Sequence, residues 1–151
     1  MEEITLAESE ELIRALLDDG QVFSFKPHGT SMLPTIRAGR DSVSILRLDG
    51  RAERFDILLY KRPTGKFVLH RVIEVGGDDY TLCGDNRVEI ERGVKDEWVV
   101  GVLNEIHYPN GKTLTRGTNA FLRAGRRALR RYPLRALRWR LSRIFHKIIG
   151  K

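Results

Sequence analysis

Two residue types in this sequence could together cleave an amide bond, namely serine and histidine. Ser31 lies in residues 29–35, between Gly29, which can adopt backbone conformations closed to other residues, and Pro34, which fixes its own φ and disfavours helix just before it. The segment predicts a kinked connection that exposes the Ser31 hydroxyl. A serine beside glycine and proline is also a common turn residue, so a purely structural role stays open.

A serine hydroxyl needs a nearby base whose pKa lies close to the working pH, and histidine meets that need. His70 differs from the other three histidines because it lies within a predicted strand, on an apolar face with Val68 and Val72. An imidazole buried there without a partner would cost free energy. His70 is therefore either a general base or a core histidine with a hydrogen-bond partner. The others are His28, three residues before Ser31, His107, after the last long strand, and His146, near the C-terminus.

The elements around these residues are predicted to be mostly short strands. Alternating apolar residues indicate strands near residues 21–25, 43–48, 56–60, 66–75, 80–83, 97–106 and 113–115, with a hairpin signal at residues 109–112. A capping box at residues 5–8 and a stop at Gly20 indicate a helix over about 6–19. With no βαβ alternation, we expect a mainly β fold with a coiled, barrel-like sheet.

Cysteine content and hydropathy restrict the function classes. Cys83 is the only cysteine, which excludes an internal disulfide and a thiolate zinc cluster, and no cofactor or metal is expected. A thiol nucleophile at Cys83 is an alternative to Ser31, although nothing nearby indicates a lowered pKa. The acidic N-terminus does not resemble a secretory signal, and no apolar run is long enough to span a bilayer. We expect a cytoplasmic protein that can contact a membrane peripherally.

Charge divides the chain into two parts. Residues 111–151 contain 13 Lys and Arg residues and no acidic residue, whereas residues 1–110 contain all 20 acidic residues. This asymmetry predicts a functional core joined to a basic arm, and the composition changes near Gly117, so we expect a domain over 1–116, which the motifs described below make the catalytic one, and an arm over 117–151. We expect two helices in the arm, separated at Pro133, the second with an apolar stripe from Leu134 to Ile148. An anionic membrane surface is the expected partner of the arm; nucleic acid and the acidic core of the protein itself are the alternatives.

Six short motifs, in order, resemble the signal peptidase I family over roughly residues 21–107. They are Ser-Met-Leu-Pro-Thr from Ser31, Ala-Gly-Arg-Asp-Ser-Val from Ala38, Phe-Asp-Ile-Leu-Leu-Tyr from Phe55, Leu-His-Arg-Val-Ile from Leu69, Gly-Asp-Asn from Gly84 and Val-Val-Gly-Val from Val99. The resemblance implies a serine endopeptidase that cleaves leader or signal peptides, with Ser31 as nucleophile. Bacterial members have a lysine base where this chain has His70, and archaeal and endoplasmic-reticulum members have histidine there.

The resemblance also implies an acid that orients His70 and groups that bind the oxyanion. Asp85 in the Gly-Asp-Asn motif is the best match for the acid, and the second acid of the Ser-His members corresponds here only to Glu89 or Glu91. Asp85 could instead be a turn carboxylate that binds backbone amides. Thr30 and Met32, on either side of Ser31, are the candidates for oxyanion and substrate binding.

Two alternatives to a leader peptidase remain at this stage. Self-cleaving repressors of the SOS type share the expected sheet, but they use a lysine base and carry a DNA-binding domain in front, whereas only about 20 residues precede the sheet here. A non-catalytic module could also bind peptides along its sheet and nucleic acid or lipid through its arm. In the leading hypothesis, the substrate binds as an added extended strand.

Overall fold

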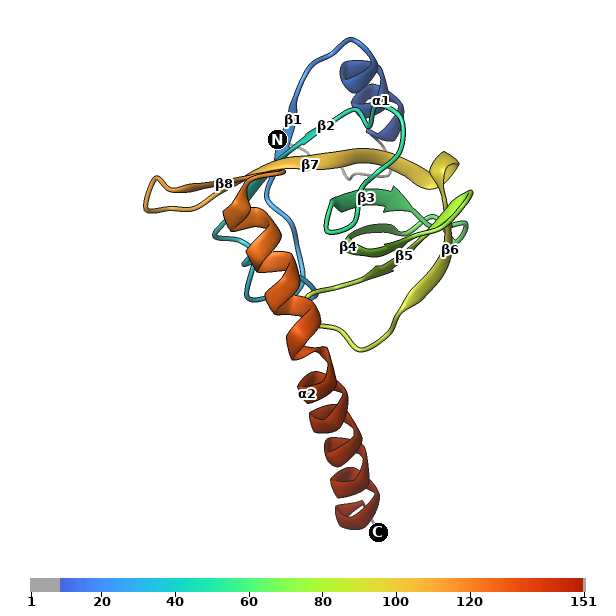
Figure 1. Ribbon diagram of the computed structural model, residues 1–151, viewed down its shortest axis with the longest axis vertical. Helices are drawn as coiled ribbons and strands as arrows, with labels where there is room; N and C mark the ends of the chain where they lie inside the picture. The colour runs from blue at the N-terminus through green and yellow to red at the C-terminus, as the bar shows by residue number, and fades with distance from the viewer. Residues whose placement is uncertain (1–8, 151) are drawn as a thin grey trace.

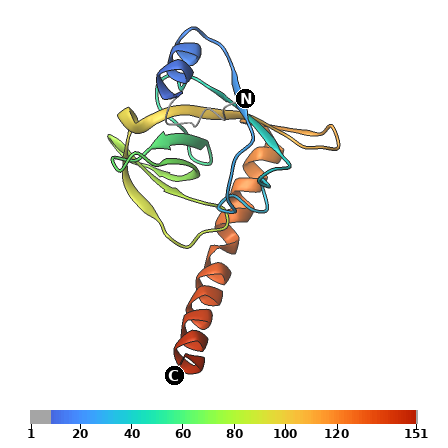
Figure 2. The same ribbon diagram turned by 180° about the vertical axis from the view of Figure 1, so that it is seen from behind.

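The computed structural model describes residues 9–150 and has a mainly β fold, as the sequence predicts (Figures 1 and 2). Its antiparallel sheet has eight strands in the order β1-β2-β7-β3-β4-β5-β6, with β8 paired to β7. Strands β1 and β6 end this order and do not pair with each other among the described residues, so the sheet is open. The predicted closure into a barrel is not confirmed. The strands are β1 Phe23–Phe25, β2 Ser42–Leu46, β3 Ile57–Lys61, β4 Phe67–Val75, β5 Asp79–Cys83, β6 Glu91–Lys95, β7 Val99–His107 and β8 Thr113–Thr115.

Seven of the eight strands coincide with predicted segments, and the exception is β6. Its sequence, Glu-Arg-Gly-Val-Lys, contains a single buried apolar residue, Val94, and so lacks the alternation that indicates a strand. Backbone pairing with β5 at the edge of the sheet makes it a strand. A short 3-10 helix, η1 Asp96–Trp98, occupies the beginning of the strand predicted over 97–106.

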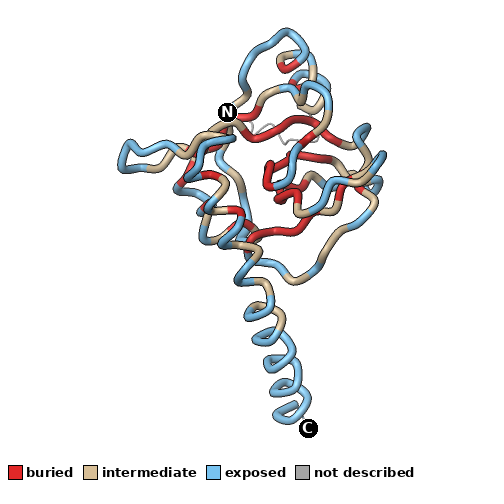
Figure 3. Tube along the Cα trace, in the orientation of Figure 1, coloured by how far each residue is buried: buried red, intermediate tan, exposed pale blue. Residues whose placement is uncertain are grey.

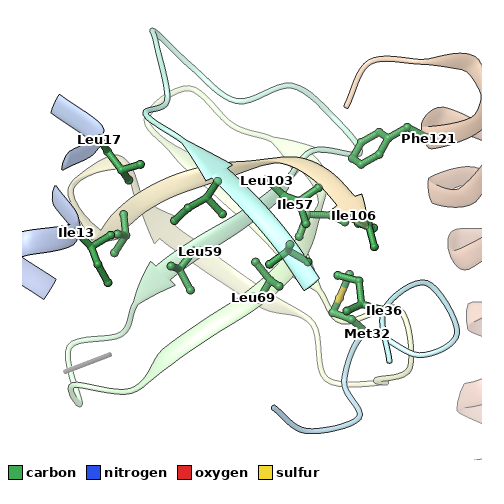
Figure 4. Packing of buried hydrophobic residues seen from close by; sticks show 13 residues of the cluster. Ile13, Leu17, Met32, Ile36, Ile57, Leu59, Leu69, Leu103, Ile106 and Phe121 are labelled. Carbon is green, nitrogen blue, oxygen red and sulfur yellow. The ribbon is translucent and has the colours of Figure 1, made fainter. Parts of the chain in front are cut away.

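Two apolar clusters form the core on either side of the sheet. The larger one includes Leu59 and Leu69 from the central strands and receives Ile13 and Leu17 from helix α1 Glu10–Asp18 (Figure 4). The helix predicted over 6–19 is therefore observed from residue 10, and the capping box at residues 5–8 lies outside the described residues. The smaller cluster includes Val68 and Val72 of β4, as the predicted alternation requires.

The C-terminal arm is one helix, α2 Asn119–Ile149, and not the predicted pair of helices. Pro133 lies within it, although its ring cannot donate the backbone hydrogen bond of that turn. Side chains on both sides of Pro133 fasten the helix to the domain: the Tyr132 hydroxyl donates to the Val88 carbonyl at 2.8 Å, and Arg135 Nε donates to the Arg87 carbonyl at 3.0 Å. Arg135 Nη1 also donates to the Ala128 carbonyl, seven residues earlier in the helix, at 2.7 Å. These tertiary bonds hold the helix through the proline.

Helix α2 packs on the domain with its first half and projects from it with its second half (Figures 1 and 3). Phe121 is fully buried, and a Cβ at Gly125 would meet the Phe55 ring at 2.8 Å, so only glycine permits this close approach. The stripe from Leu134 to Ile148 is exposed and does not dock on the core. Among residues 9–150, no helix is long and apolar enough to cross a membrane.

Candidate functional site

The segment that carries Ser31 is a series of turns anchored in the core. Gly29 has φ +81°, the conformation that the sequence predicts for it. The side chains of Met32 and Ile36 are buried in the larger core cluster, and the Ile36 N–H donates to the Met32 carbonyl at 2.9 Å (Figure 4). Between these anchors Ser31 stays partly exposed. The sequence prediction of a kinked, accessible serine is therefore confirmed.

His70 lies in the middle of β4, opposite Leu58 of β3, and its side chain is 8% exposed. It points to the side of the sheet that holds Val68 and Val72, which form part of the smaller core cluster. The position of the ring is thus fixed by packing within a paired strand. Such a ring cannot reorient freely, which suits a base that must meet one defined proton.

The loop after β5 brings Ser31 and His70 together. An ideal Cβ at Gly84 would lie 2.6 Å from the Ser31 carbonyl oxygen and 3.0 Å from His70 Nε2, so one point in space touches both residues. The next residues fasten the loop to the serine segment, because the Asn86 N–H donates to the Ser31 carbonyl at 2.8 Å and Asn86 Nδ2 donates to the Thr30 carbonyl at 3.1 Å. Gly84 is required here because a side chain would fill the space that the two residues share.

The other nitrogen of His70 faces a hydrogen-bonded chain that ends in an ion pair. His70 Nδ1 lies 3.5 Å from the Tyr60 hydroxyl, which donates to Glu91 Oε2 at 2.6 Å. Arg62 Nε donates to Glu91 Oε1 at 2.7 Å. Because the Tyr60 proton is directed at Glu91, the Tyr60 oxygen can only accept from Nδ1. The tautomer with the proton on Nδ1 satisfies this contact, and in that tautomer Nε2, which faces the Ser31 carbonyl across Gly84, is an acceptor.

Asp85 lies close to the site but binds Arg71 rather than His70. Its carboxylate forms a bidentate pair with the Arg71 guanidinium, with both N–O distances 2.8 Å and both side chains about 1% exposed. It also accepts from Thr35 Oγ1 at 2.5 Å, which ties the end of the serine segment to the loop. Arg71 in addition donates to the Phe55 carbonyl at 3.0 Å. The carboxylate that a hydrogen-bonded chain connects to His70 is Glu91, one of the three acids left open by the sequence.

Burial governs the proton affinities in this site. Burial, followed by the charge of Arg62, lowers the pKa of His70 from 6.5 to about 4, while the Glu91 carboxylate acts in the opposite direction. Burial disfavours the charged form of Glu91, but hydrogen bonds from Arg62 and Tyr60 keep its pKa below the ordinary value. Burial and the bond to Glu91 raise the pKa of Tyr60. At neutral pH, His70 is neutral and Glu91 is charged.

A cleft of about 700 Å³ opens at this point of the sheet. The serine segment, the stretch Phe67–His70 of β4, Arg87 and residues 89–91 line it, together with Arg62 and Lys66. Strand β5 pairs with β4 only from Arg71 onward, so Phe67–His70 has β3 as its strand partner on one side. Among residues 9–150, no strand pairs with the other side of Phe67–His70, and this stretch lines the cleft together with Ser31. Its volume is in the range of small-ligand and peptide sites.

The remaining candidates are placed as follows. Met32 is buried and lines the cleft, Thr30 is exposed at its rim, and Glu89 is exposed on the opposite wall. Cys83 is buried, its pKa is raised by that burial, and it does not line the cleft, which argues against a thiol nucleophile. Within residues 9–150, no group of three His, Cys, Asp or Glu side chains is arranged to hold a metal ion.

Tyr60 is the site residue that sequence reasoning missed, and a signal for it was present. The predicted strands 56–60 and 66–75, joined by the turn at Pro63 to Gly65, form an antiparallel hairpin in which Tyr60 pairs with Val68 and Leu58 pairs with His70. Alternation along each strand then places Tyr60 and His70 on the same face. A buried tyrosine on the face of a buried histidine indicates a hydrogen-bonded pair.

A scan against protein-family models finds no match to this chain, and searches of curated proteins and of solved structures find none either.

Proposed function

We propose that this protein is a serine endopeptidase of the signal peptidase I type, which cleaves leader or signal peptides with Ser31 as nucleophile and His70 as general base. The observation that carries the proposal is that Ser31 and His70 both line the cleft, and that the Ser31 carbonyl oxygen and His70 Nε2 both lie within 3.0 Å of an ideal Cβ at Gly84. The order of the six motifs supports the same assignment, and so does the open strand edge at Phe67–His70, along which an extended peptide can pair.

The chemistry follows from the two nitrogens of His70. Nε2 accepts the Ser31 hydroxyl proton as Oγ attacks the peptide carbonyl, and the resulting oxyanion is held by the Ser31 N–H and by a further donor such as Thr30. The imidazolium then gives its proton to the leaving amine, and the acyl-serine is hydrolysed by water that His70 deprotonates in the same way. Glu91 stabilises the imidazolium through the Tyr60 hydroxyl, in the role that a directly bonded carboxylate has in other serine peptidases.

Asp85 has a positioning role in this mechanism. It neutralises buried Arg71 and binds Thr35. The loop that contains Gly84 is thereby held in a fixed position relative to the segment that contains Ser31. This role differs from the direct contact with His70 that the motif resemblance implies.

Labelling with a fluorophosphonate, which reacts with activated serines and requires no knowledge of the substrate, tests the proposal. Wild-type protein should be labelled, and Ser31→Ala and His70→Gln should not. Ser24→Ala is the matched control, because Ser24 lies exposed on β1, and it should be labelled like wild type. A library of leader peptides should be cleaved by wild type and by Ser24→Ala only.

A non-catalytic peptide-binding module is the competing function. Absence of labelling in wild type, together with binding of leader peptides that are never cleaved, would reject the peptidase in favour of the module. Labelling that persists in Ser31→Ala would show that another residue is the nucleophile.

A further inference from the structure

Helix α2 has a continuous face directed away from the domain. Phe121, Gly125 and Tyr132 turn toward the core, since the first two are buried and the third binds Val88. At 3.6 residues per turn, the residues on the opposite side of the helix form what we call the outward face. In the first half of the helix its members are basic, namely Arg123, Arg126, Arg127, Arg130 and Arg131. In the second half they are mainly apolar, namely Leu134, Leu137, Leu141, Ile144, Phe145 and Ile148, and Arg138 lies at the margin of the face as Arg131 does.

Every member of the outward face is exposed. The six apolar side chains are between 51% and 70% exposed, although they are large. The half of α2 that projects from the domain is mostly exposed (Figure 3). A contiguous exposed apolar patch on this scale marks an interaction surface. The bonds from Tyr132 and Arg135 to the Val88 and Arg87 carbonyls hold the helix on either side of Pro133, so the two halves of the face are presented together.

We propose that the outward face of α2 binds the surface of an anionic lipid bilayer, with its apolar half inserted at the level of the acyl chains and its arginines on lipid phosphates. An amphipathic helix with bulky apolar residues on one side and many arginines is the kind of element that lies in a membrane interface. The direction of the face permits this, because the domain packs on the other side of the helix and stays above the membrane plane.

The charge of α2 favours lipid over the other occupants of such a face. No acidic residue follows Glu105, so a second copy of the helix would place arginines against arginines with no opposite charge to pair them. Nucleic acid would complement the arginines but would leave the six apolar side chains in water. An anionic bilayer complements both halves of the face at once.

Membrane binding would also place the cleft near the lipid surface. Arg87 and residues 89–91 form one wall of the cleft, and the carbonyls of Arg87 and Val88 accept hydrogen bonds from α2. This consequence rests on the proposed function. The binding itself does not, since it is measured without any catalytic readout.

Co-sedimentation of the full chain with vesicles tests the proposal. Binding should be strong on phosphatidylcholine vesicles that contain phosphatidylserine, weak on phosphatidylcholine alone, and reduced by salt. The triple variant Leu137→Gln, Leu141→Gln, Ile144→Gln should lower the partition coefficient by at least about 10-fold. Trp139→Gln is the matched control, because it removes a large exposed side chain from the other side of the helix, and it should bind like wild type.

Two double variants test whether vesicle binding depends on which side of the helix carries the positive charge or only on the total charge. Arg127→Gln with Arg130→Gln, on the outward face, should weaken binding on the order of 10-fold. Arg143→Gln with Lys147→Gln removes the same charge from the other side and should weaken it less. Because Cys83 is buried, a cysteine introduced on α2 can be labelled selectively with an environment-sensitive fluorophore. Its emission should shift to the blue on vesicles at position 144 and not at position 143.

Four results would overturn the proposal. The first is equal binding to neutral and anionic vesicles, and the second is an equal loss of vesicle binding in the outward-face variants and in their controls. The third is that wild type forms a dimer without lipid and the triple glutamine variant is a monomer. The fourth is tight binding to a double-stranded RNA probe that persists in that variant and displaces the protein from vesicles.

Discussion

Burial of His70 should make the protein lose stability as the pH falls below the ordinary pKa of histidine. In the unfolded chain this residue titrates near 6.5, and in the folded protein its pKa is lowered to about 4, chiefly by burial. Between these values the unfolded state binds the proton and the folded state does not, so stability rises with pH across this window. The contribution is complete above pH 6.5 and is lost as the pH falls through about 4. At about 1.36 kcal/mol per pKa unit, the loss from pH 7 to pH 4 is about 3 kcal/mol.

Urea unfolding of wild type and His70→Gln at a series of pH values measures this contribution. The glutamine does not titrate, so the difference in pH dependence between the two proteins isolates His70 from the carboxylates that protonate in the same range. His146→Gln serves as the control, since His146 is exposed on the projecting half of α2, and it should follow wild type. In thermal scans, a loss of about 3 kcal/mol corresponds to a decrease in Tm of roughly 6 to 12 °C for a chain of this length. Parallel pH dependences of wild type and His70→Gln, or an NMR titration of His70 near 6.5, would refute the burial argument.

Three further substitutions test the site. Tyr60→Phe removes the link between His70 and its carboxylate, so fluorophosphonate labelling should slow about 5- to 30-fold, corresponding to about 1–2 kcal/mol. The free energy of unfolding should fall by about 1–3 kcal/mol, because Glu91 loses a donor, and an unchanged labelling rate would exclude the relay. Asp85→Asn leaves Arg71 buried without its counter-ion and should lower the free energy of unfolding by about 3–5 kcal/mol in urea titrations; lost labelling at full stability would instead indicate direct catalysis. Gly84→Ala should lower the free energy of unfolding by about 1–3 kcal/mol in urea titrations and abolish labelling. Gly77→Ala is its control and should change neither, because a Cβ at Gly77 would meet nothing within 4 Å.

The lowered pKa also changes the expected pH dependence of labelling. From the sequence alone, the rate should rise through an imidazole-like pKa near 6.5. With the pKa of His70 at about 4, the rate should instead be level between pH 5.5 and pH 8 and fall only near pH 4. Labelling rates from pH 4 to pH 8 distinguish the two, and a midpoint near 6.5 would show that burial does not control His70.

Local sequence determines much of this protein. Alternation of apolar residues places seven strands, and the Pro109 to Lys112 turn joins β7 to β8 as predicted. Gly29 adopts the positive φ that its position before Ser31 suggests. These features are local, because each depends on side-chain periodicity or on the backbone freedom of one residue.

Tertiary structure decides the features that depend on contacts distant in sequence. Strand β6 exists because β5 offers a backbone edge, and α2 continues through Pro133 because Tyr132 and Arg135 bind a loop more than 40 residues earlier. The acid of the site is the clearest case. The resemblance of the Gly-Asp-Asn motif favours Asp85, but the pairing of β3, β4 and β5 turns Asp85 to Arg71 and connects Glu91 to His70 through Tyr60. A buried carboxylate pairs with the nearest buried cation, and only the folded arrangement of the strands determines which cation that is.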